Sequence, residues 1–508
     1  MLSPLSLTFL SILLILVASR FARSLIWVPW SIERRLRRQG VRGPSRHPIS
    51  GNAGDIRRLI AAANKAKPIH GDFDHGGVVG PVLPHYELWT RLYGKTFLFW
   101  FGSKPRLVVR EPELIKEVML DRAGSFERVR FNPLSKHLFG EGLVGLDGAK
   151  WVQHRRVISP AFNIERVKGW VPAIVTSTLK MLEGWGRDSE GREFELDMHK
   201  ELHNFTADVI SRVAFGSCFE EGKQIFQMQE EQMHLVSIAL RSIYIPGFRF
   251  LPTKRNRKRW QLDKEIRRLL RNLIEANGEA SENSKNLLGL MISANKCQED
   301  EKDQMTIDDI IDECKTFYFA GKDTTANLLT WALLLLALHQ DWQRKAHEEI
   351  FQVCGSHHEP PNADHLSHLK ILGMIINETL RLYPPAVFLM RQTTKDVRLG
   401  GLEIPSGTQL YMPTIAVHRD TQIWGEDAHR FDPSRFIEQR MHLASFFPFG
   451  LGQRICVGQN LALVEAKIAL VMVLQRFSLA ISPSYVHAPM LLLTLQPQFG
   501  AQILLRKI

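Results

Sequence analysis

A lone cysteine in a glycine-rich turn is the residue whose surroundings point most directly to chemistry. The turn reads Phe449-Gly450-Leu451-Gly452-Gln453-Arg454-Ile455-Cys456-Val457-Gly458, and a helical pattern from Gln459 to Leu474 follows it. Glycines let the turn fold back so that backbone N–H groups point at the sulfur, and the positive end of the next helix favours a thiolate. A single cysteine is more often buried and inert, but this setting predicts an anionic metal ligand.

Asp323 and Thr324 form a second candidate group, inside an apolar helical pattern at Ala320-Gly321-Lys322-Asp323-Thr324-Thr325. Gly321 weakens a helix by about 1 kcal/mol relative to Ala. A threonine hydroxyl can bond back to the preceding turn, so we expect a local groove. A glycine kink with an incidental acid is the plainer interpretation, yet burying a charge among apolar residues needs a reason. Proton transfer by Asp323 is such a reason.

Three weaker patterns contain arginine. Glu378 and Arg381 lie three apart on one helix, which alone indicates a routine ion pair of a few tenths of a kcal/mol. Arg435 lies in Phe431-Asp432-Pro433-Ser434-Arg435-Phe436, between that pair and the cysteine turn. Trp151 and Arg155 frame Trp151-Val152-Gln153-His154-Arg155. None of these patterns identifies a function by itself.

The elements that must position these residues are mostly helices. Apolar residues recur three and four positions apart near 150–185, 198–216, 223–242, 257–275, 307–339, 341–354 and 364–382. Short strands are predicted between Tyr93 and Arg110. Thr306 and Asp309 have capping-box spacing, and the helix that they begin is apolar nearly all round from Phe317 to Leu338. Such a helix belongs in the centre of a large domain, so the predicted class is mainly α with a small β region.

The amino terminus has the pattern of a membrane anchor. Residues 2–19 carry no charge, and as a helix they would be about 27 Å long against a hydrocarbon core of about 30 Å. The arginines that follow predict a single span with the body in the cytosol. A cleavable signal peptide is the alternative, favoured by Ala18 and Ser19 and opposed by the arginine cluster. We expect an anchor at 2–19, a basic segment with a Pro-rich hinge at 20–50 and one body at 51–508.

The distribution of charge argues against nucleic acid as a partner. The formal net charge is +12, and eight arginines and one glutamate between Arg20 and Arg46 supply +7 of it, leaving +5 for the remaining 462 residues. A nucleic-acid binder would carry its basic stripe on the folded body. The five cysteines are widely spaced without a CxxC pair, which favours a reducing compartment.

Taken in order, the motifs resemble those of the cytochrome P-450 family. The haem-binding signature Phe-x-x-Gly-x-Arg-x-Cys-x-Gly is matched by Phe449, Gly452, Arg454, Cys456 and Gly458. The resemblance implies the cytochrome P-450 fold as one large body, and haem b whose iron Cys456 holds as the axial thiolate. Such a thiolate pushes electron density toward the iron.

The resemblance also implies roles for the other residues. Phe449 packs beside the thiolate, Arg454 pairs with one haem propionate, and Trp151 and Arg155 lie at the other. Glu378, Arg381 and Arg435 form a buried triad that sets the haem pocket. Thr324 holds the reacting oxygen and Asp323 relays protons from water. The motifs run from about 150 to 460, and with the anchor the resemblance covers essentially the whole chain.

The implied activity is that of an endoplasmic-reticulum monooxygenase that hydroxylates a hydrophobic small molecule with O2. Its electrons come from NADPH through NADPH-cytochrome P-450 reductase, because the chain has no nucleotide-binding glycine motif of its own. Basic residues beside the cysteine turn are expected to meet the reductase, with Lys150, Arg156 and Arg440 as candidates. The pocket is expected near Phe126 to Leu134, Phe319, Ala320, Val387 to Met390, and Leu492 to Thr494.

The carboxyl-terminal stretch and the segment 245–253 look like the plant branch that hydroxylates isoprenoids and hormones, with brassinosteroid-inactivating hydroxylases as the nearest likeness. The pocket stretch Pro385-Ala386-Val387-Phe388 departs from those enzymes. Two alternatives stay open. One is an oxygen-independent haem isomerase or dehydratase of the same fold, which typically lacks the pair that Asp323 and Thr324 supply. The other is a membrane haem binder without enzyme activity.

Overall fold

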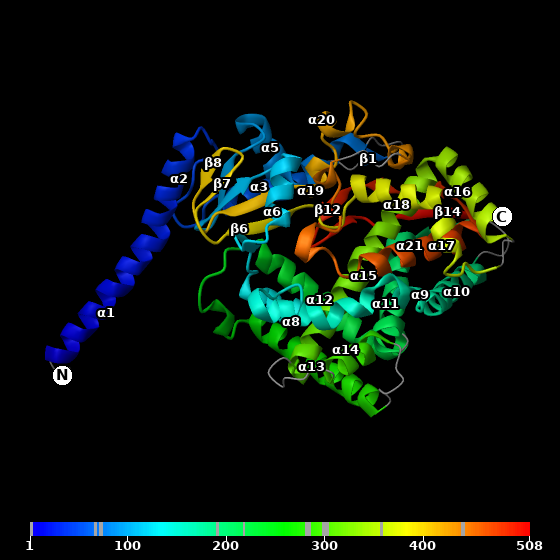
Figure 1. Cartoon of the computed structure of the whole chain (residues 1–508), viewed down its shortest axis with the longest axis horizontal. Coiled ribbons are helices and arrows are strands. Elements are labelled where there is room, and N and C mark those ends of the chain that lie inside the picture. Colours follow the sequence, from blue (N-terminus) through cyan, green and yellow to red (C-terminus); the bar gives the residue numbers. More distant parts are fainter. Residues whose placement is uncertain are drawn as a thin grey trace.

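The computed structural model describes residues 4–65, 69–70, 75–188, 193–216, 219–279, 286–296, 304–355, 359–437 and 442–508. The body is mainly helical with small sheets, which confirms the predicted class (Figure 1). Its longer helices are α3 (Ala53–Ala63), α5 (Pro84–Tyr93), α6 (Pro112–Leu120), α8 (Gly148–Ile158), α10 (Val171–Asp188), α11 (Met198–Phe215), α12 (Phe219–Leu240), α13 (Lys254–Glu279), α14 (Leu287–Lys296), α15 (Ile307–Leu338), α16 (Gln340–Cys354), α18 (Lys370–Leu382) and α21 (Gln459–Leu474). Short helices are α4 (Val79–Val82), α7 (Lys136–Phe139), α9 (Ile164–Lys168), α17 (His365–His368), α19 (Thr414–Val417) and α20 (Thr421–Trp424).

Helix α15 is the axis of the body. Its first turn has the expected capping box: the Thr306 hydroxyl accepts from the Asp309 N–H at 3.1 Å, and the Asp309 carboxylate accepts from the Thr306 N–H at 3.0 Å. From Ala326 to Ala337 every side chain is buried, as expected for a helix that is apolar on all sides. Helix α11 packs along it, and α18 and α21 also contact it. Residues on α15 therefore reach the centre of the domain.

The strands form one larger sheet and several small ones. The larger sheet has the order β2-β3-β9-β6-β4, from β2 (Leu98–Phe101), β3 (Lys104–Val108), β9 (Gln409–Met412), β6 (Leu389–Thr393) and β4 (Phe126–Arg128). A three-stranded sheet joins β10 (Phe477–Ile481), β14 (Gln502–Lys507) and β5 (Phe194–Asp197). Three strand pairs also lie among the described residues: β1 (Ile69–His70) with β11 (Val486–His487), β7 (Val397–Leu399) with β8 (Leu402–Ile404), and β12 (Pro489–Leu491) with β13 (Leu495–Pro497).

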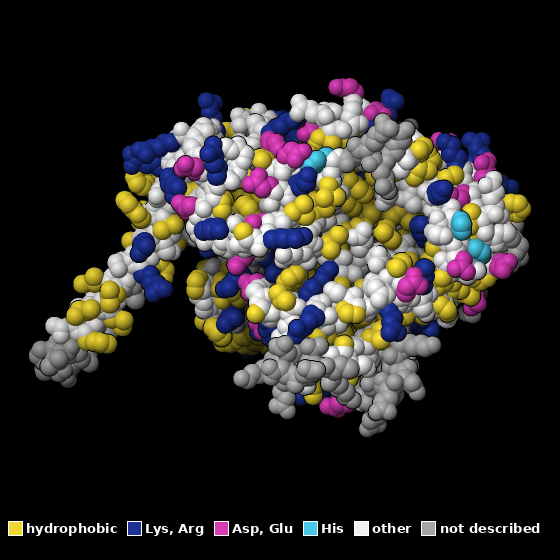
Figure 2. Space-filling view, viewed as in Figure 1, with side chains coloured by type: hydrophobic (Ala, Val, Ile, Leu, Met, Phe, Trp, Pro, Cys, Tyr) yellow, Lys and Arg dark blue, Asp and Glu magenta, His cyan; other side chains and the backbone are white. Residues whose placement is uncertain are grey.

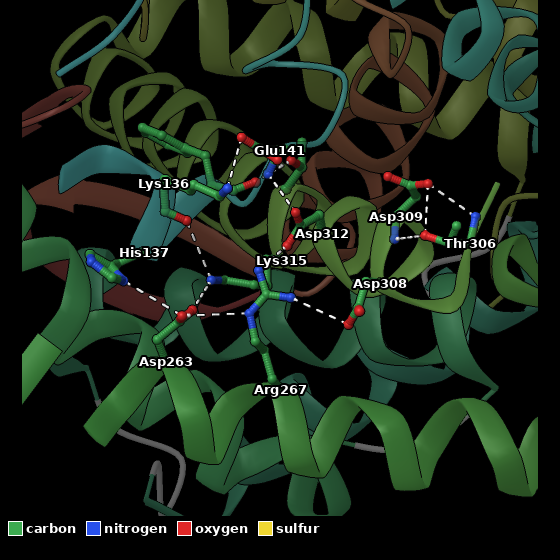
Figure 3. A network of polar contacts seen from close by, with 12 residues as sticks. Lys136, His137, Glu141, Asp263, Arg267, Thr306, Asp308, Asp309, Asp312 and Lys315 are labelled. Atoms are coloured by element: carbon green, nitrogen blue, oxygen red, sulfur yellow. Dashed lines mark hydrogen bonds and ion pairs between the residues drawn. The ribbon is translucent and has the colours of Figure 1, made fainter. Parts of the chain in front are cut away.

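Partly buried ion pairs fasten α13 to the first half of α15, and a hydrogen bond holds the loop after α7 there (Figure 3). Lys315 of α15 is fully buried and pairs with Asp263 of α13. Arg267 of α13 donates to the Asp312 carboxylate at 2.5 Å, and the other oxygen of that carboxylate accepts from the Glu141 N–H at 2.8 Å. Paired buried charges fix geometry more than they add stability, so this network holds the loop after α7 against α15.

The amino-terminal helix projects from the body (Figure 1). Helix α1 (Pro4–Ala22) continues through a π turn (Arg23–Trp27) into α2 (Val28–Arg38), and its apolar side chains are exposed, with basic side chains where it meets the body (Figure 2). Arg46 donates to the Leu25 carbonyl of that turn at 3.1 Å, and the face of α2 that holds Ile32 and Leu36 is buried. By length and composition, this helix is a candidate membrane span.

Candidate active site

A cavity of about 400 Å³ lies between the cysteine turn and the middle of α15. Cys456, Phe449 and Gly458 line one side, and Ala320, Gly321 and Thr324 line the other. Most of the remaining wall is apolar and includes Met119, Leu143, Phe162, Ile210, Pro385, Ala386 and Leu389. The structure thus brings together two motifs that are more than a hundred residues apart in the sequence.

The backbone of the turn presents the Cys456 thiol to the cavity. The Cys456 N–H donates to the Phe449 carbonyl at 2.9 Å, and Gly450 and Gly452 have φ values of +75° and +70°. Only glycine adopts such values readily. Burial raises the pKa of the Cys456 thiol, while the Gly458 N–H and the Arg155 guanidinium lower it. The Gly458 N–H favours the thiolate, as expected of this turn, but burial outweighs its effect on the pKa of Cys456.

Gly452→Ala is expected to destabilise the turn, because an added Cβ would lie 2.3 Å from the Met119 carbonyl oxygen. A positive φ alone costs a non-glycine residue about 1–2 kcal/mol. The matched control is Gly407→Ala, where φ is +83° and no atom lies within 4 Å of the added Cβ. Thermal unfolding of the purified protein should show a clearly larger drop for Gly452→Ala; equal drops would mean that the Met119 contact is unimportant.

Arginine side chains converge on another part of the cavity wall. Arg128, Arg155, Arg391 and Arg454 all line it. The Arg454 guanidinium donates to the Leu146 carbonyl at 2.8 Å and lies over the Trp151 ring, 4.2 Å from its centroid. Burial, and then the charge of Arg454, lowers the pKa of Arg128 to about 9 and that of Arg391 to about 10. These cations repel one another in the protein without a ligand.

The repulsion has a geometric origin and indicates an anionic ligand. Arg128 of β4 and Arg391 of β6 are directly opposite in the antiparallel register. Like charges at such a position are destabilising, and carboxylates placed between guanidinium groups would offset the repulsion. The carboxylates of a haem, with Cys456 as the iron ligand, match this set of donors. Neither residue was singled out from the sequence, although Arg128 lies in the expected pocket stretch Phe126 to Leu134. The available signal was an arginine in each of two short strands that flank that pocket.

The side chains of Thr324 and Asp323 on α15 point in different directions. Thr324 lines the cavity, and its hydroxyl donates to the Ala320 carbonyl at 2.6 Å. At Gly321, an added Cβ would lie 2.7 Å from Ile210, so the glycine is needed for helix packing. Asp323 is only 3% exposed, and its carboxylate accepts a hydrogen bond from Thr494 instead of lining the cavity. Burial raises the pKa of Asp323 to about 6.

The residues Glu378, Arg381 and Arg435 do not line the cavity, although Leu380, which shares α18 with the first two, does. Glu378 and Arg381 are both fully buried and make two hydrogen bonds, at 2.6 and 2.7 Å. Arg435 is more distant, with its Nε 3.8 Å from Glu378. Arg381 also donates to the carbonyls of His418, Ala428 and Arg430. The group therefore ties α18 to the segment before the cysteine turn, away from direct contact with a ligand.

Some of the residues that were expected to line the pocket do not line the cavity. Arg128, Ala320 and Leu389 line it, whereas Phe319, Val387, Phe388, Met390 and Leu492 to Thr494 do not. The chain turns at Pro385 and Ala386, so these two residues face the cavity in place of Val387 and Phe388. Among the expected reductase contacts, Lys150 pairs with Asp309 at 2.6 Å and Arg156 is exposed. Arg440 lies outside the described residues.

The fold and this cavity define the class as a haem protein with a cysteine ligand. The family model of cytochrome P450 matches residues 83–503. Cytochrome P450 734A6 of Oryza sativa subsp. japonica is 44% identical, with 96% of this chain and 94% of that protein covered. Cytochrome P450 734A1 of Arabidopsis thaliana is 44% identical, with 98% and 96% covered, and cytochrome P450 CYP72A616 of Paris polyphylla is 43% identical, with 96% and 95% covered. The chain belongs to the cytochrome P450 family.

Membership confirms the resemblance seen in the motifs. The protein is an oxidoreductase of the monooxygenase class, with haem b, a cysteine thiolate as axial ligand, and electrons supplied by a reductase. Bound haem supplies the activation of O2 at its iron, and the thiolate favours cleavage of the O–O bond. The protein's own part is to hold and orient the cofactor and to exclude water with apolar walls.

Proposed function

We propose that the protein hydroxylates a hydrophobic, isoprenoid-type small molecule such as a steroid, triterpenoid or hormone. The observation that carries this proposal is the apolar cavity between Cys456 and the Gly321 to Thr324 groove. An apolar site with few polar groups suits a rigid hydrocarbon skeleton. Within this class a brassinosteroid is the substrate that we put forward for testing, because the sequence resembles brassinosteroid-inactivating hydroxylases.

The roles of the site residues are part of the proposal. Cys456 is the axial ligand, with Phe449 and Gly458 beside it. Arg454, Trp151 and Arg155 hold the haem carboxylates, and we add Arg128 and Arg391 to that set. Thr324 holds the reacting oxygen, which is supported by its position in the cavity wall. Asp323 relays protons, and Glu378, Arg381 and Arg435 position the haem-binding segment.

The redox partner and the membrane location are also part of the proposal. We propose NADPH-cytochrome P450 reductase as the electron donor, meeting the face that carries Lys150 and Arg156. Residues 2–19 anchor the protein in the endoplasmic reticulum membrane, 20–50 form the basic segment and hinge, and 51–508 form the cytosolic body. The exposed apolar surface of α1 and the arginines at its carboxyl end support this arrangement.

The substrate test compares a brassinosteroid, a triterpenoid and a cytokinin with the reductase and NADPH. We expect NADPH-dependent product from at least one of the first two, because their apolar skeletons can displace water from the cavity wall. Mass spectrometry should find one added oxygen atom per hydroxylation, and Cys456→Ser protein is the control for product that does not need the enzyme. No product from the brassinosteroid would remove that substrate, and product from the cytokinin alone would overturn the proposal of a steroid or triterpenoid skeleton.

A further inference from the structure

The Asp323 carboxyl is held by a residue from a distant part of the chain. Thr494 lies 171 residues along the sequence, in the loop between β12 and β13, and donates its hydroxyl hydrogen to Asp323. The same hydroxyl accepts a hydrogen bond from the Asn327 amide at 3.0 Å, so its donor hydrogen is directed toward Asp323. Thr494 is 6% exposed and Asp323 is 3% exposed. In the described part of the chain, Thr494 makes the hydrogen bond that fixes this carboxyl.

The loop that carries Thr494 is also fastened to the wall of the cavity. The Leu495 N–H donates to the carbonyl of Pro385, a cavity-lining residue, at 3.1 Å. The Leu495 carbonyl accepts from the Trp331 indole of α15 at 3.2 Å. Leu493 packs against the apolar cluster around Phe139 and Val236. The loop thus connects the wall of the cavity with the carboxyl of Asp323.

We propose that Thr494 is a positioning residue for Asp323, and that it holds this carboxyl ionised and at a fixed orientation for proton transfer. The inference rests on the proposed proton relay by Asp323. The hydrogen bond favours the ionised form, whereas burial favours the protonated one. The link from Thr494 through Leu495 to Pro385 means that the orientation of Asp323 depends on the wall that a substrate would touch.

Charged and titratable groups on α11, α12 and α15 surround this part of the core. Lys322 of α15 lies near Asp323 and pairs with Glu230 of α12 at 3.6 Å. On α11, burial lowers the pKa of His199 and, well below its ordinary value, that of His203, so both imidazoles are neutral at pH 7. Lys322 lowers the pKa of Asp323 and Glu230 raises it, but both effects are smaller than those of burial and of the Thr494 hydrogen bond.

Removal of the Thr494 hydroxyl is expected to raise the pKa of Asp323. Burial raises the pKa of Asp323 to about 6, while the Thr494 hydrogen bond lowers it. Without the Thr494 hydroxyl the ionised form loses a hydrogen bond, so the midpoint rises by about 1–2 pH units. A larger fraction of Asp323 is then protonated at pH 7. Thr494→Ser keeps the hydroxyl and should leave the midpoint unchanged.

The experiment follows the infrared band of the protonated carboxyl against pH in the holoenzyme, assigned by its loss in Asp323→Asn. We expect the midpoint to rise in Thr494→Val and to stay in Thr494→Ser. Thr330→Val is the matched control, because the buried Thr330 hydroxyl donates back to the Ala326 carbonyl of its own helix, at 2.7 Å. If Thr494→Val does not fold, Thr494→Ala makes the same test. An unchanged midpoint in the folded variant would overturn the inference.

A second measurement separates this inference from the proposed function on which it rests. Product formed per NADPH consumed should fall several-fold in Asp323→Asn and in Thr494→Val, as O2 takes two electrons and two protons to become hydrogen peroxide instead. The ratio of product to NADPH should equal that of wild type in Thr494→Ser and Thr330→Val. Normal coupling in Asp323→Asn would refute the proton relay itself. Poor coupling in Asp323→Asn with normal coupling in Thr494→Val would refute only the role of Thr494.

Discussion

Cys456→Ser is expected to abolish the carbon monoxide difference band that is diagnostic of a thiolate-ligated haem. A serine hydroxyl is not ionised at neutral pH, so it cannot supply the anionic ligand that Cys456 presents to the cavity. The measurement is the difference spectrum of the reduced membrane protein, with wild type beside the variant. The expected loss is complete, which makes this the largest effect predicted here.

The matched control for this experiment is Cys354→Ser. Cys354 is also a free thiol, but it is buried at the end of α16 and does not line the cavity. Its variant should keep the band at a wavelength equal to that of wild type. Absence of the band from well-folded wild-type protein, or its persistence in Cys456→Ser, would show that Cys456 does not hold the iron.

Glu378→Ala is expected to have the largest effect on stability. It leaves the fully buried Arg381 guanidinium without its carboxylate, and breaking a buried pair from one side costs about 3–5 kcal/mol. Glu378 also accepts the Asp432 N–H at 2.8 Å, so the variant frees the segment that leads to the cysteine turn. Denaturant unfolding of the purified protein should give a markedly lower midpoint, together with lower haem content.

Glu265→Ala is the control, because Glu265 and Arg268 have the same spacing of three residues on an exposed face of α13. Exposed pairs contribute about 0–1 kcal/mol, so the midpoint should barely move. Equal shifts for Glu378→Ala and Glu265→Ala would contradict the view that burial of Arg381 makes the pair important.

Features whose determinants are neighbours in the sequence could be predicted before the structure. The turn around Cys456 and the capping box of Thr306 and Asp309 each depend on residues within a few positions, and the central position of α15 follows from apolar residues along a single helix. Short spacing fixes these arrangements because a turn or a helix brings such residues together whatever the rest of the chain does.

Other features were decided only by tertiary structure. The opposition of Arg128 and Arg391 depends on the register of β4 with β6, and a shift of one residue would remove it. The turning of Asp323 toward Thr494, and the place of Pro385 and Ala386 in the wall, depend on how the carboxyl-terminal loop packs. Periodicity records which face of an element is apolar, but not which distant element covers that face. The sequence by itself thus determined the ligand turn and the central helix, and tertiary packing decided which side chains share the cavity.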